Sequence, residues 1–311
     1  MTDRPGRPGA GRKPGRGPAV IAVGLAAVAL ALSACSGAGT AATGAAGSAP
    51  PPSGPSASPL ATPDIPGVPG DASNGTSPAT SPAALPLAGK IIGIDPGHNG
   101  GNFTDPGAIA RLVWNGTAWE TCDTTGTTTD GGYPEAQFTF DVARYLRADL
   151  RRDGARVVMT RAGNDGVGPC VDRRAQIIND ARANVAVDIH ADGGPASGRG
   201  FTVLEPVADG PNDTVITASQ RLGDDVRQAM LAGTAMPVSD YTGVDGIMPR
   251  DDLAGLNLTT VPKVLIECGN MPSAADAAYL ASRAGQRQIA KALEAAIIRF
   301  LTGRWPARSA R

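Results

Sequence analysis

This 311-residue sequence lacks the short motifs that mark the commonest hydrolases. It has no Gly-x-Ser-x-Gly motif, which is typical of serine hydrolases, and no His-Glu-x-x-His motif, which is typical of zinc peptidases. It also lacks an excess of basic residues, because the net charge is −1 and the pI is about 6.1. A nucleic acid is therefore not among the expected partners.

The apolar run near the N-terminus, residues 19–32, is shorter than the roughly 18 to 20 residues that a membrane-spanning helix needs. Because a basic stretch precedes this run, we interpret residues 1–34 as an export signal. The run ends in Leu32-Ser33-Ala34-Cys35, which resembles the lipobox of bacterial lipoproteins. The resemblance implies that Cys35 is acylated and anchors the exported protein to the outer face of the cytoplasmic membrane. The alternative is an ordinary cleaved signal that happens to precede a cysteine.

Large apolar residues are scarce in residues 35–87, which consist mostly of Ala, Gly, Ser, Thr and Pro. Such a composition cannot form a hydrophobic core and predicts a disordered linker, although a glycosylated spacer would have the same composition. Residues 88–304 have the length of one domain, show no internal repeat and are expected to be monomeric. Residues 305–311 form a short basic tail, for which we expect a solvated state.

Strand-like and helix-like patterns alternate within residues 88–304, which is typical of a layered α/β fold. We predict a single domain with a twisted, mostly parallel sheet flanked by helices, plus an inserted hairpin. The strand candidates are residues 90–95, 155–160, 184–189, 200–204 and 262–267. The helix candidates are residues 134–153, 171–183 and 214–231, and a C-terminal pair within 273–301.

The hairpin candidate is residues 112–119, because Asn115-Gly116 between strand-forming residues suits a type I′ turn. We expect its two tryptophans to pack against the domain.

Only four cysteines occur in the chain. With Cys35 acylated and Cys268 buried as a free thiol after an apolar strand, Cys122 and Cys170 are left as a possible disulfide pair. Export would take them to a compartment in which such a bond forms.

Histidine is rarer still, since the chain has only His98 and His190, and each closes an apolar, strand-like run. Neutral imidazole is the commonest protein ligand for zinc, and strand ends open onto clefts, so the pair predicts a zinc site. A catalytic zinc usually takes three protein ligands, and the third candidate is Glu135, in the first turn of a predicted helix. The alternative role for Glu135 is to stabilise the helix dipole.

Glu267 is a second carboxylate of interest because it ends the apolar run Val264-Leu265-Ile266. A desolvated glutamate has a raised pKa and can act as general base and then as general acid in zinc-assisted hydrolysis of an amide or ester. The alternative is a strand-end carboxylate that accepts hydrogen bonds from the backbone of Gly269 and Asn270.

Five short runs, in this order along residues 88–302, resemble the zinc-dependent N-acetylmuramoyl-L-alanine amidases. The runs are Ile94-Asp95-Pro96-Gly97-His98, Pro134-Glu135, Thr160-Arg161, Asp188-Ile189-His190-Ala191-Asp192 and Val264-Leu265-Ile266-Glu267-Cys268-Gly269-Asn270. The resemblance implies that His98, Glu135 and His190 bind Zn²⁺ and that Glu267 is the catalytic acid/base residue. It also implies the reaction, which is hydrolysis of the amide between N-acetylmuramic acid and L-alanine in peptidoglycan or its fragments, in the cell envelope.

The sequence departs from the family pattern in three places. Asp188 and Asp192 stand where the family usually has Ser and Asn, and residues 109–133 form a long segment that would restrict access to the site. Asp188 and His190 share one face of a strand, so Asp188 is a candidate to contact His190 from outside the set of metal ligands. Its extra negative charge would raise the pKa of a zinc-bound water.

Arg161 and Arg173 also match positions of the family. Because arginine–carboxylate pairs commonly tie loops together, we expect both residues to form structural ion pairs rather than to contact substrate.

Other classes of protein also fit parts of this sequence. A cysteine hydrolase is disfavoured, because Cys268 has no histidine downstream, and Cys122 and Cys170 lack the context of an activated nucleophile. A metal-free glycosidase could use Glu135 and Glu267, but it leaves both histidines unexplained. A membrane-tethered peptidoglycan-binding module without turnover and a zinc peptidase of the peptide stem remain as alternatives.

Overall fold

The structure is a computed structural model that describes residues 84–306. The predicted export signal, Cys35, most of the predicted linker and residues 307–311 lie outside the described residues. None of the helices in residues 84–306 combines the length and hydropathy of a membrane span.

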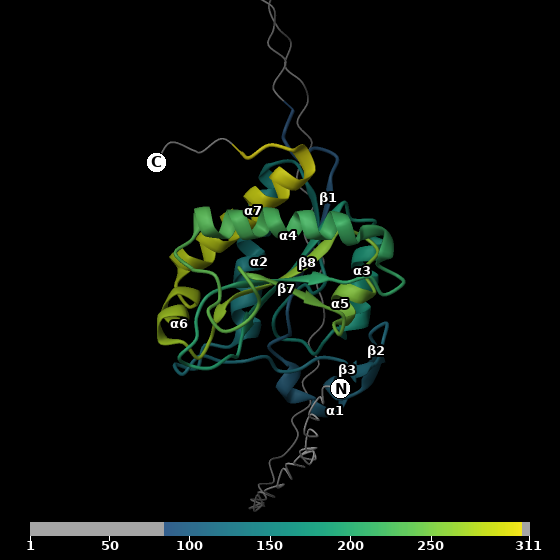
Figure 1. The fold of residues 1–311 in the computed structure, drawn as a ribbon. Helices are drawn as coiled ribbons and strands as arrows, with labels where there is room; N and C mark the ends of the chain where they lie inside the picture. Colours follow the sequence, from purple (N-terminus) through teal and green to yellow (C-terminus); the bar gives the residue numbers. More distant parts are fainter. Residues whose placement is uncertain (1–83, 307–311) are drawn as a thin grey trace, which may run out of the picture. The chain divides into compact units, whose positions relative to one another are not determined.

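A six-stranded sheet forms the centre of the fold (Figure 1). Its strands are β1 (Ile91–Pro96), β4 (Arg156–Met159), β5 (Val185–Asp192), β6 (Thr202–Pro206), β7 (Ile247–Arg250) and β8 (Lys263–Asn270). They are arranged in the order β4-β1-β5-β8-β6-β7, and the first four are parallel to one another. β6 is antiparallel to β8, and β7 is parallel to β6. The prediction of a mostly parallel sheet is confirmed.

Helices cover both faces of the sheet, as predicted (Figure 1). On one face, apolar side chains of β1, β5 and β8 form the main core with α2 (Glu135–Arg152), α4 (Ile216–Gly233) and α7 (Arg283–Thr302). On the other face, α3 (Val171–Asp180) and α5 (Ala254–Asn257) pack in smaller apolar clusters. The remaining helices are α1 (Pro106–Ile109), α6 (Ala274–Leu280) and the short 3-10 turns η1 (Asn102–Thr104) and η2 (Asp213–Val215).

The face that carries α3 and α5 has buried charges in its middle. Side chains alternate between the two faces of a strand, and the neighbours Ile94 and Val187 belong to the main core, so Asp95 and Asp188 point to the opposite face. Asp95 and Asp188 are direct neighbours in the β1–β5 register, and Lys263 begins the next strand, β8. All three are buried. The centre of the sheet therefore carries a polar row that needs internal partners.

The sequence predicts five of the six strands and misses β7. Proline has no N–H to donate to a ladder, so Pro249 argues against a strand at this position. β7 tolerates it because it is an edge strand that pairs only with β6.

The predicted hairpin forms from β2 (Leu112–Trp114) and β3 (Trp119–Thr121), but the predicted turn type is wrong. The pairing register leaves four residues, 115–118, in the loop. A type I′ turn needs positive φ at both central residues, and of Asn115 and Gly116 only Gly116 has it, at +110°. The Asn115 side chain instead closes the loop by accepting two backbone hydrogen bonds from within it.

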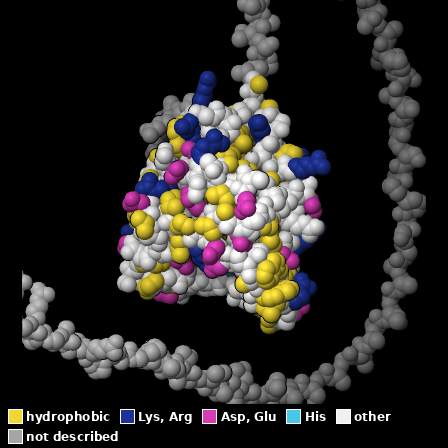
Figure 2. Space-filling view, turned by 45° about the vertical axis from the view of Figure 1, so that its right-hand side comes forward, with side chains coloured by type: hydrophobic (Ala, Val, Ile, Leu, Met, Phe, Trp, Pro, Cys, Tyr) yellow, Lys and Arg dark blue, Asp and Glu magenta, His cyan; other side chains and the backbone are white. Residues whose placement is uncertain are grey.

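The face of the described residues that Figure 2 shows mixes acidic, basic and apolar side chains. Trp114 and Trp119 of the hairpin are 45% and 65% exposed and contact each other edge to face, with ring centroids 5.7 Å apart. The expectation that these tryptophans pack against the domain is therefore wrong, because each finds its main aromatic partner in the other.

The expected disulfide between Cys122 and Cys170 is confirmed, with the two Cα atoms 4.4 Å apart. It joins the residue after β3 to the residue that precedes α3. Cys268 is a buried free thiol, also as predicted.

Replacing both cysteines, as Cys122→Ser/Cys170→Ser, should destabilise the protein. The bond spans a sequence separation of 48 residues, and closing a loop of that size stabilises by about 4 kcal/mol in the chain-entropy model. We expect the double variant to unfold at a lower urea concentration than the oxidised wild type, as followed by circular dichroism. The two proteins should become alike once the wild type is reduced, and equal midpoints before reduction would contradict the prediction.

Candidate metal centre

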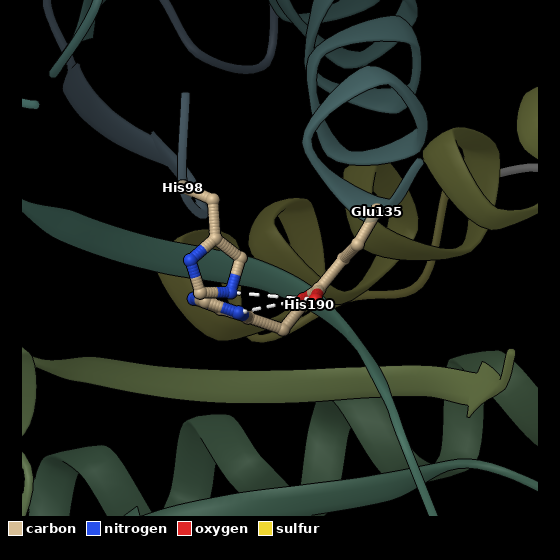
Figure 3. Close-up of side chains that lie close together, drawn as sticks. All are labelled: His98, Glu135 and His190. Carbon is tan, nitrogen blue, oxygen red and sulfur yellow. Dashed lines mark hydrogen bonds and ion pairs between the residues drawn. The ribbon is translucent and has the colours of Figure 1, made fainter. Parts of the chain in front are cut away.

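His98, Glu135 and His190 come together beside the ends of β1 and β5 (Figure 3). Each offers one ligand atom, and these atoms all lie within 4.8 Å of one another. His98 follows β1 by two residues, Glu135 is the first residue of α2, and His190 lies near the end of β5. The structure thus brings together the three residues that the sequence singles out as metal ligands.

His98 turns its two ring nitrogens toward different carboxylates. Its Nε2 lies 3.3 Å from Glu135 Oε2, and its Nδ1 lies 2.9 Å from Asp123 Oδ1. An ionised carboxylate only accepts hydrogen bonds, so the contact with Asp123 places a proton on Nδ1. With a metal in place, Nε2 is the nitrogen of His98 that faces it.

His190 is oriented the other way round. Its Nδ1 lies 3.0 Å from Glu135 Oε1, and its Nε2 lies 3.4 Å from Asp188 Oδ1. The two imidazole rings meet edge to face with their centroids 4.9 Å apart. The two histidines therefore present opposite ring nitrogens to the same carboxylate.

Glu135 is fixed from several sides. Besides the two histidines, its carboxylate accepts hydrogen bonds from the backbone N–H of Thr127, at 2.9 Å, and of Ala191, at 3.1 Å. Burial acts to raise the pKa of Glu135, but the two histidines outweigh burial and hold the pKa well below its usual range. The carboxylate is therefore ionised in place and ready to bind a cation.

The histidines show the reciprocal effect. Burial acts to lower the pKa of His98, but Glu135 and Asp123 overcome it and raise the pKa to about 9. The pKa of His190 is raised above its ordinary value by Asp188 and Glu135, which likewise outweigh burial. Protons thus balance the carboxylates in the metal-free cluster, and a cation that takes the place of those protons would keep the balance.

Two imidazoles and one carboxylate are a recurrent ligand set of catalytic zinc. Ligand atoms bound to one tetrahedral zinc at roughly 2.0–2.2 Å lie about 3.3 Å from one another. The contacts of Glu135 with His98, at 3.3 Å through Oε2, and with His190, at 3.0 Å through Oε1, are close to that spacing, and the three ligand atoms lie within 4.8 Å of one another. The residues present therefore fit a zinc ion with one position left open.

Two glycines allow the ligands to pack this closely. A Cβ on Gly97 would lie 2.2 Å from the ring of His190. A Cβ on Gly126 would lie 2.7 Å from the ring of His98, and Gly126 also has a φ of +72°. The backbone at both positions forms part of the wall against which the imidazoles lie.

Glu267 lies directly across from His190 in the β5–β8 register. Its side chain is half-buried, and its Oε2 atom is buried without a hydrogen-bond partner among residues 84–306. Burial raises the pKa of Glu267 to about 8, and the charges of Glu135 and Asp192 act in the same direction. The N–H of Asn270 donates to Asp276 instead, so the alternative in which the following turn satisfies Glu267 finds no support in this contact.

The arginines differ in part from expectation. Arg161 is buried and donates to the backbone carbonyls of Pro96, Gly97 and Ala136. It forms no ion pair within the described part of the chain, so the expected ion pair is wrong at this position. Arg173 is exposed, and its Nη1 lies 3.8 Å from Asp180, which confirms the expected ion pair.

The neighbouring Arg174, together with Asp95, Asp123 and Lys263, escapes prediction from the sequence. Arg174 lies one helical turn before Ile178, which is fully buried, so the period of α3 places it on the inner face. Lys263 opens a central apolar strand, where a lone charge is costly. Both are signals that a buried partner must exist, although neither identifies the partner.

A cavity of about 160 Å³ lies beside the two histidines. Its lining includes Glu120 and Thr121 of β3 and residues of α5. The Glu120 side chain accepts a hydrogen bond from the N–H of Ala254, at 3.0 Å, which joins the hairpin to α5. Residues of the long segment 109–133 therefore line one side of this cavity; that the segment restricts access to the site stays a prediction.

Comparison with known proteins agrees with this geometry. Residues 92–299 match the family model described as N-acetylmuramoyl-L-alanine amidase. Over 237 residues the chain is 40% identical to an N-acetylmuramoyl-L-alanine amidase of Mycobacterium tuberculosis, which covers 74% of this chain and 94% of that protein. A germination-specific N-acetylmuramoyl-L-alanine amidase of Bacillus subtilis is 25% identical over 236 residues, covering 71% of this chain and 84% of that protein.

Among solved structures, an N-acetylmuramyl-L-alanine amidase from Mycobacterium smegmatis matches with a TM-score of 0.66 and 40% identity. The match covers 70% of this chain and 99% of that one. The apo form of the corresponding amidase from Mycobacterium abscessus matches with a TM-score of 0.65 and 40% identity, covering 70% of this chain and 100% of that one. The protein described here is an α/β enzyme of the amidase class. It belongs to the N-acetylmuramoyl-L-alanine amidase family.

Changing Gly97 to alanine should destabilise the metal-free protein by about 1–3 kcal/mol, the usual cost of overpacking. The added Cβ would force the ring of His190 out of its place. Gly163→Ala is the matched control, because a Cβ there has no neighbour within 4 Å. The free energies of unfolding come from urea titrations, and equal values for the two variants would rule out the close packing described here.

Proposed function

We propose that this protein uses Zn²⁺ to hydrolyse the amide bond between N-acetylmuramic acid and L-alanine in peptidoglycan or its fragments. The observation that carries the proposal is the convergence of His98, Glu135 and His190, with the half-buried carboxylate of Glu267 opposite His190. Residue chemistry alone supports metal-assisted hydrolysis of an amide or ester. The identity of the bond is supported by the family and by the names of the relatives.

His98, Glu135 and His190 would hold the zinc. When bound, zinc supplies a Lewis acid that polarises the substrate carbonyl and lowers the pKa of a water molecule. The histidines would hold the zinc as neutral rings, through Nε2 of His98 and Nδ1 of His190, so each ring would give up the proton on that nitrogen. The backbone N–H groups of Thr127 and Ala191 keep the Glu135 carboxylate in its orientation.

Glu267 is the proposed acid and base. It accepts a proton from the water whose oxygen attacks the carbonyl carbon, and it donates that proton to the nitrogen of L-alanine as the C–N bond breaks. The products are the muramoyl carboxylic acid and a peptide with a free amino group. A pKa raised by burial suits both steps, because the group must take up a proton and then give it away.

The alternatives fare less well against this geometry. A metal-free glycosidase would need Glu135 as a free acid or nucleophile, whereas both of its oxygens face histidines. A binding module without turnover gives no reason for a carboxylate oxygen, Glu267 Oε2, that is buried without a hydrogen-bond partner among residues 84–306. A zinc peptidase of the peptide stem would use the same residues, so it is distinguished by the bond that is cleaved.

Mass spectrometry of a muramoyl-peptide incubated with the purified protein tests the proposal. We expect release of the muramoyl acid and of a peptide that begins with free L-alanine, with loss of the reaction on chelation and recovery with Zn²⁺. The Glu267→Gln variant should keep its bound zinc and lose roughly 10²–10⁴-fold in kcat. Glu294→Gln serves as control, since Glu294 pairs with Lys291 on α7.

Two results would contradict separate parts of the proposal. Release of the muramoyl product after complete removal of zinc would refute the metal mechanism. Cleavage within the peptide stem would leave the mechanism in place and overturn the substrate.

We also propose that residues 1–34 direct export, that acylated Cys35 anchors the chain, and that residues 35–87 tether the catalytic domain of residues 88–304. This arrangement supports a role in cell-wall turnover at the cell envelope, because it would place the domain between membrane and wall. A linker of this composition spans on the order of tens of Å. Residues 305–311 have no assigned role.

Labelling with a fatty-acid analogue in a bacterial host tests the anchor. The wild-type chain should take up the label and sediment with membranes, and Cys35→Ser should lose the label and remain in the soluble fraction. Cys268→Ser is the control, because the Cys268 thiol is buried in the domain. An unlabelled wild type would show that the signal is of the ordinary cleaved kind.

A further inference from the structure

Five side chains of alternating charge form one continuous buried group behind the candidate metal centre. We call this group the charged row, and its members in order are Asp123, Arg174, Asp95, Lys263 and Asp188. Arg174 lies 3.1 Å from Asp123 and 3.1 Å from Asp95, and Lys263 Nζ lies 2.7 Å from Asp95 and 2.9 Å from Asp188. Each of the five residues is buried. The group draws on three strands, one helix and the segment after the hairpin.

The two ends of the charged row touch the two histidines. Asp123 contacts Nδ1 of His98, and Asp188 approaches Nε2 of His190, which in each ring is the nitrogen turned away from Glu135. Asp188 Oδ1 is buried and has no hydrogen-bond partner among residues 84–306. The imidazole of His190, 3.4 Å away, is the group toward which this oxygen points.

The two cations offset the charges of the three buried carboxylates. Asp95 and Asp188 are side by side in neighbouring strands, and two buried carboxylates in that position repel each other. Lys263 Nζ bridges them. Burial acts to lower the pKa of Lys263, but Asp188 and Asp95 outweigh it and raise the pKa, so the amine is charged.

We propose that Lys263 is a positioning residue for the metal centre and acts on His190 through Asp188. Together with Arg174 and Asp123 on the other side, it fixes which ring nitrogen of each histidine faces the metal. The inference rests on the zinc site proposed above. It also accounts for Asp188, because the charge of Lys263 offsets the extra negative charge that this residue brings beside the ligand.

The charged row and Glu135, taken together, carry a charge that matches a divalent cation. Three carboxylates and two cations give the charged row a net charge of −1, and Glu135 adds another −1. The resulting charge of −2 is equal and opposite to that of Zn²⁺. Asp188 and Lys263 therefore function as a pair, since the loss of either alone leaves an uncompensated charge in the sheet.

Zinc affinity, measured by competition with a chromogenic chelator, is the first test. We expect Asp188→Asn and Lys263→Met each to raise the Kd for Zn²⁺ by about 10–100-fold, the usual effect of losing a partner of a metal-binding histidine. Lys291→Met is the matched control, because this lysine is 55% exposed and pairs with Glu294 and Asp149 on the helices α7 and α2. Its Kd should stay within twofold of wild type.

The double variant Asp188→Ser/Lys263→Met tests the positioning role of Lys263 if the single variant Lys263→Met does not fold. It removes one anion and one cation together, so it leaves Asp95 paired with Arg174 and adds no net charge to the interior. We expect it to fold and still to bind zinc about 10–100-fold more weakly than wild type.

Nitrogen-15 NMR of the imidazole rings is the second test, and two histidines give an unambiguous spectrum. In the zinc-loaded wild type we expect His98 to carry its proton on Nδ1 and His190 to carry its proton on Nε2. In the double variant the His98 signals should stay, and the Nε2–H signal of His190 should broaden through exchange with water. A purely structural role for Lys263 would lower the unfolding midpoint without this selective change.

The outcomes separate the inference from the proposed function. A double variant with wild-type zinc affinity and an unchanged His190 signal would overturn the positioning role. Equal losses of affinity in the Lys291→Met control would overturn it as well. A wild-type protein that binds no zinc would overturn the proposed function itself.

Discussion

The contact of one carboxylate with two imidazoles is the interaction on which the rest of the site depends. Glu135 meets both histidines and accepts backbone hydrogen bonds from Thr127 and Ala191, so α2, β5 and the loops after β1 and β3 all converge on it. Buried charges persist only when they are paired and hydrogen-bonded, and here each charge has partners in different elements. The packing of α2 against the sheet is therefore also the assembly of the metal centre.

The sequence predicts which three residues come together, because they are rare residue types at element ends. Two histidines at strand ends, a glutamate in the first turn of a helix and a glutamate closing an apolar strand are all visible without coordinates. The charged row is not visible, because its contacts join residues 79 and 168 positions apart. Its members are common residue types, and only the side-chain directions across three strands bring them together.

Local hydrogen bonding and strand position explain where the predictions from the sequence are wrong. The Asn-Gly pair predicts a hairpin with a tight backbone turn. The hairpin forms, but the Asn115 side chain closes its loop by accepting backbone hydrogen bonds. β7 contains a proline, which argues against a strand when only the sequence is considered. An edge strand tolerates it. Arg161 satisfies backbone carbonyls rather than a carboxylate, because the end of β1 and the start of α2 expose such carbonyls to it.

The disulfide lies next to one end of the charged row. Cys122 directly precedes Asp123, and Cys170 lies one helical turn before Arg174, so the bond clamps both sides of the Asp123–Arg174 ion pair. Asp123 of that ion pair contacts Nδ1 of His98. A chain whose thiols are still reduced lacks this clamp, so oxidation of the two thiols would complete the surroundings of the first histidine. Formation of the disulfide and preparation of the candidate metal centre would then be a single event.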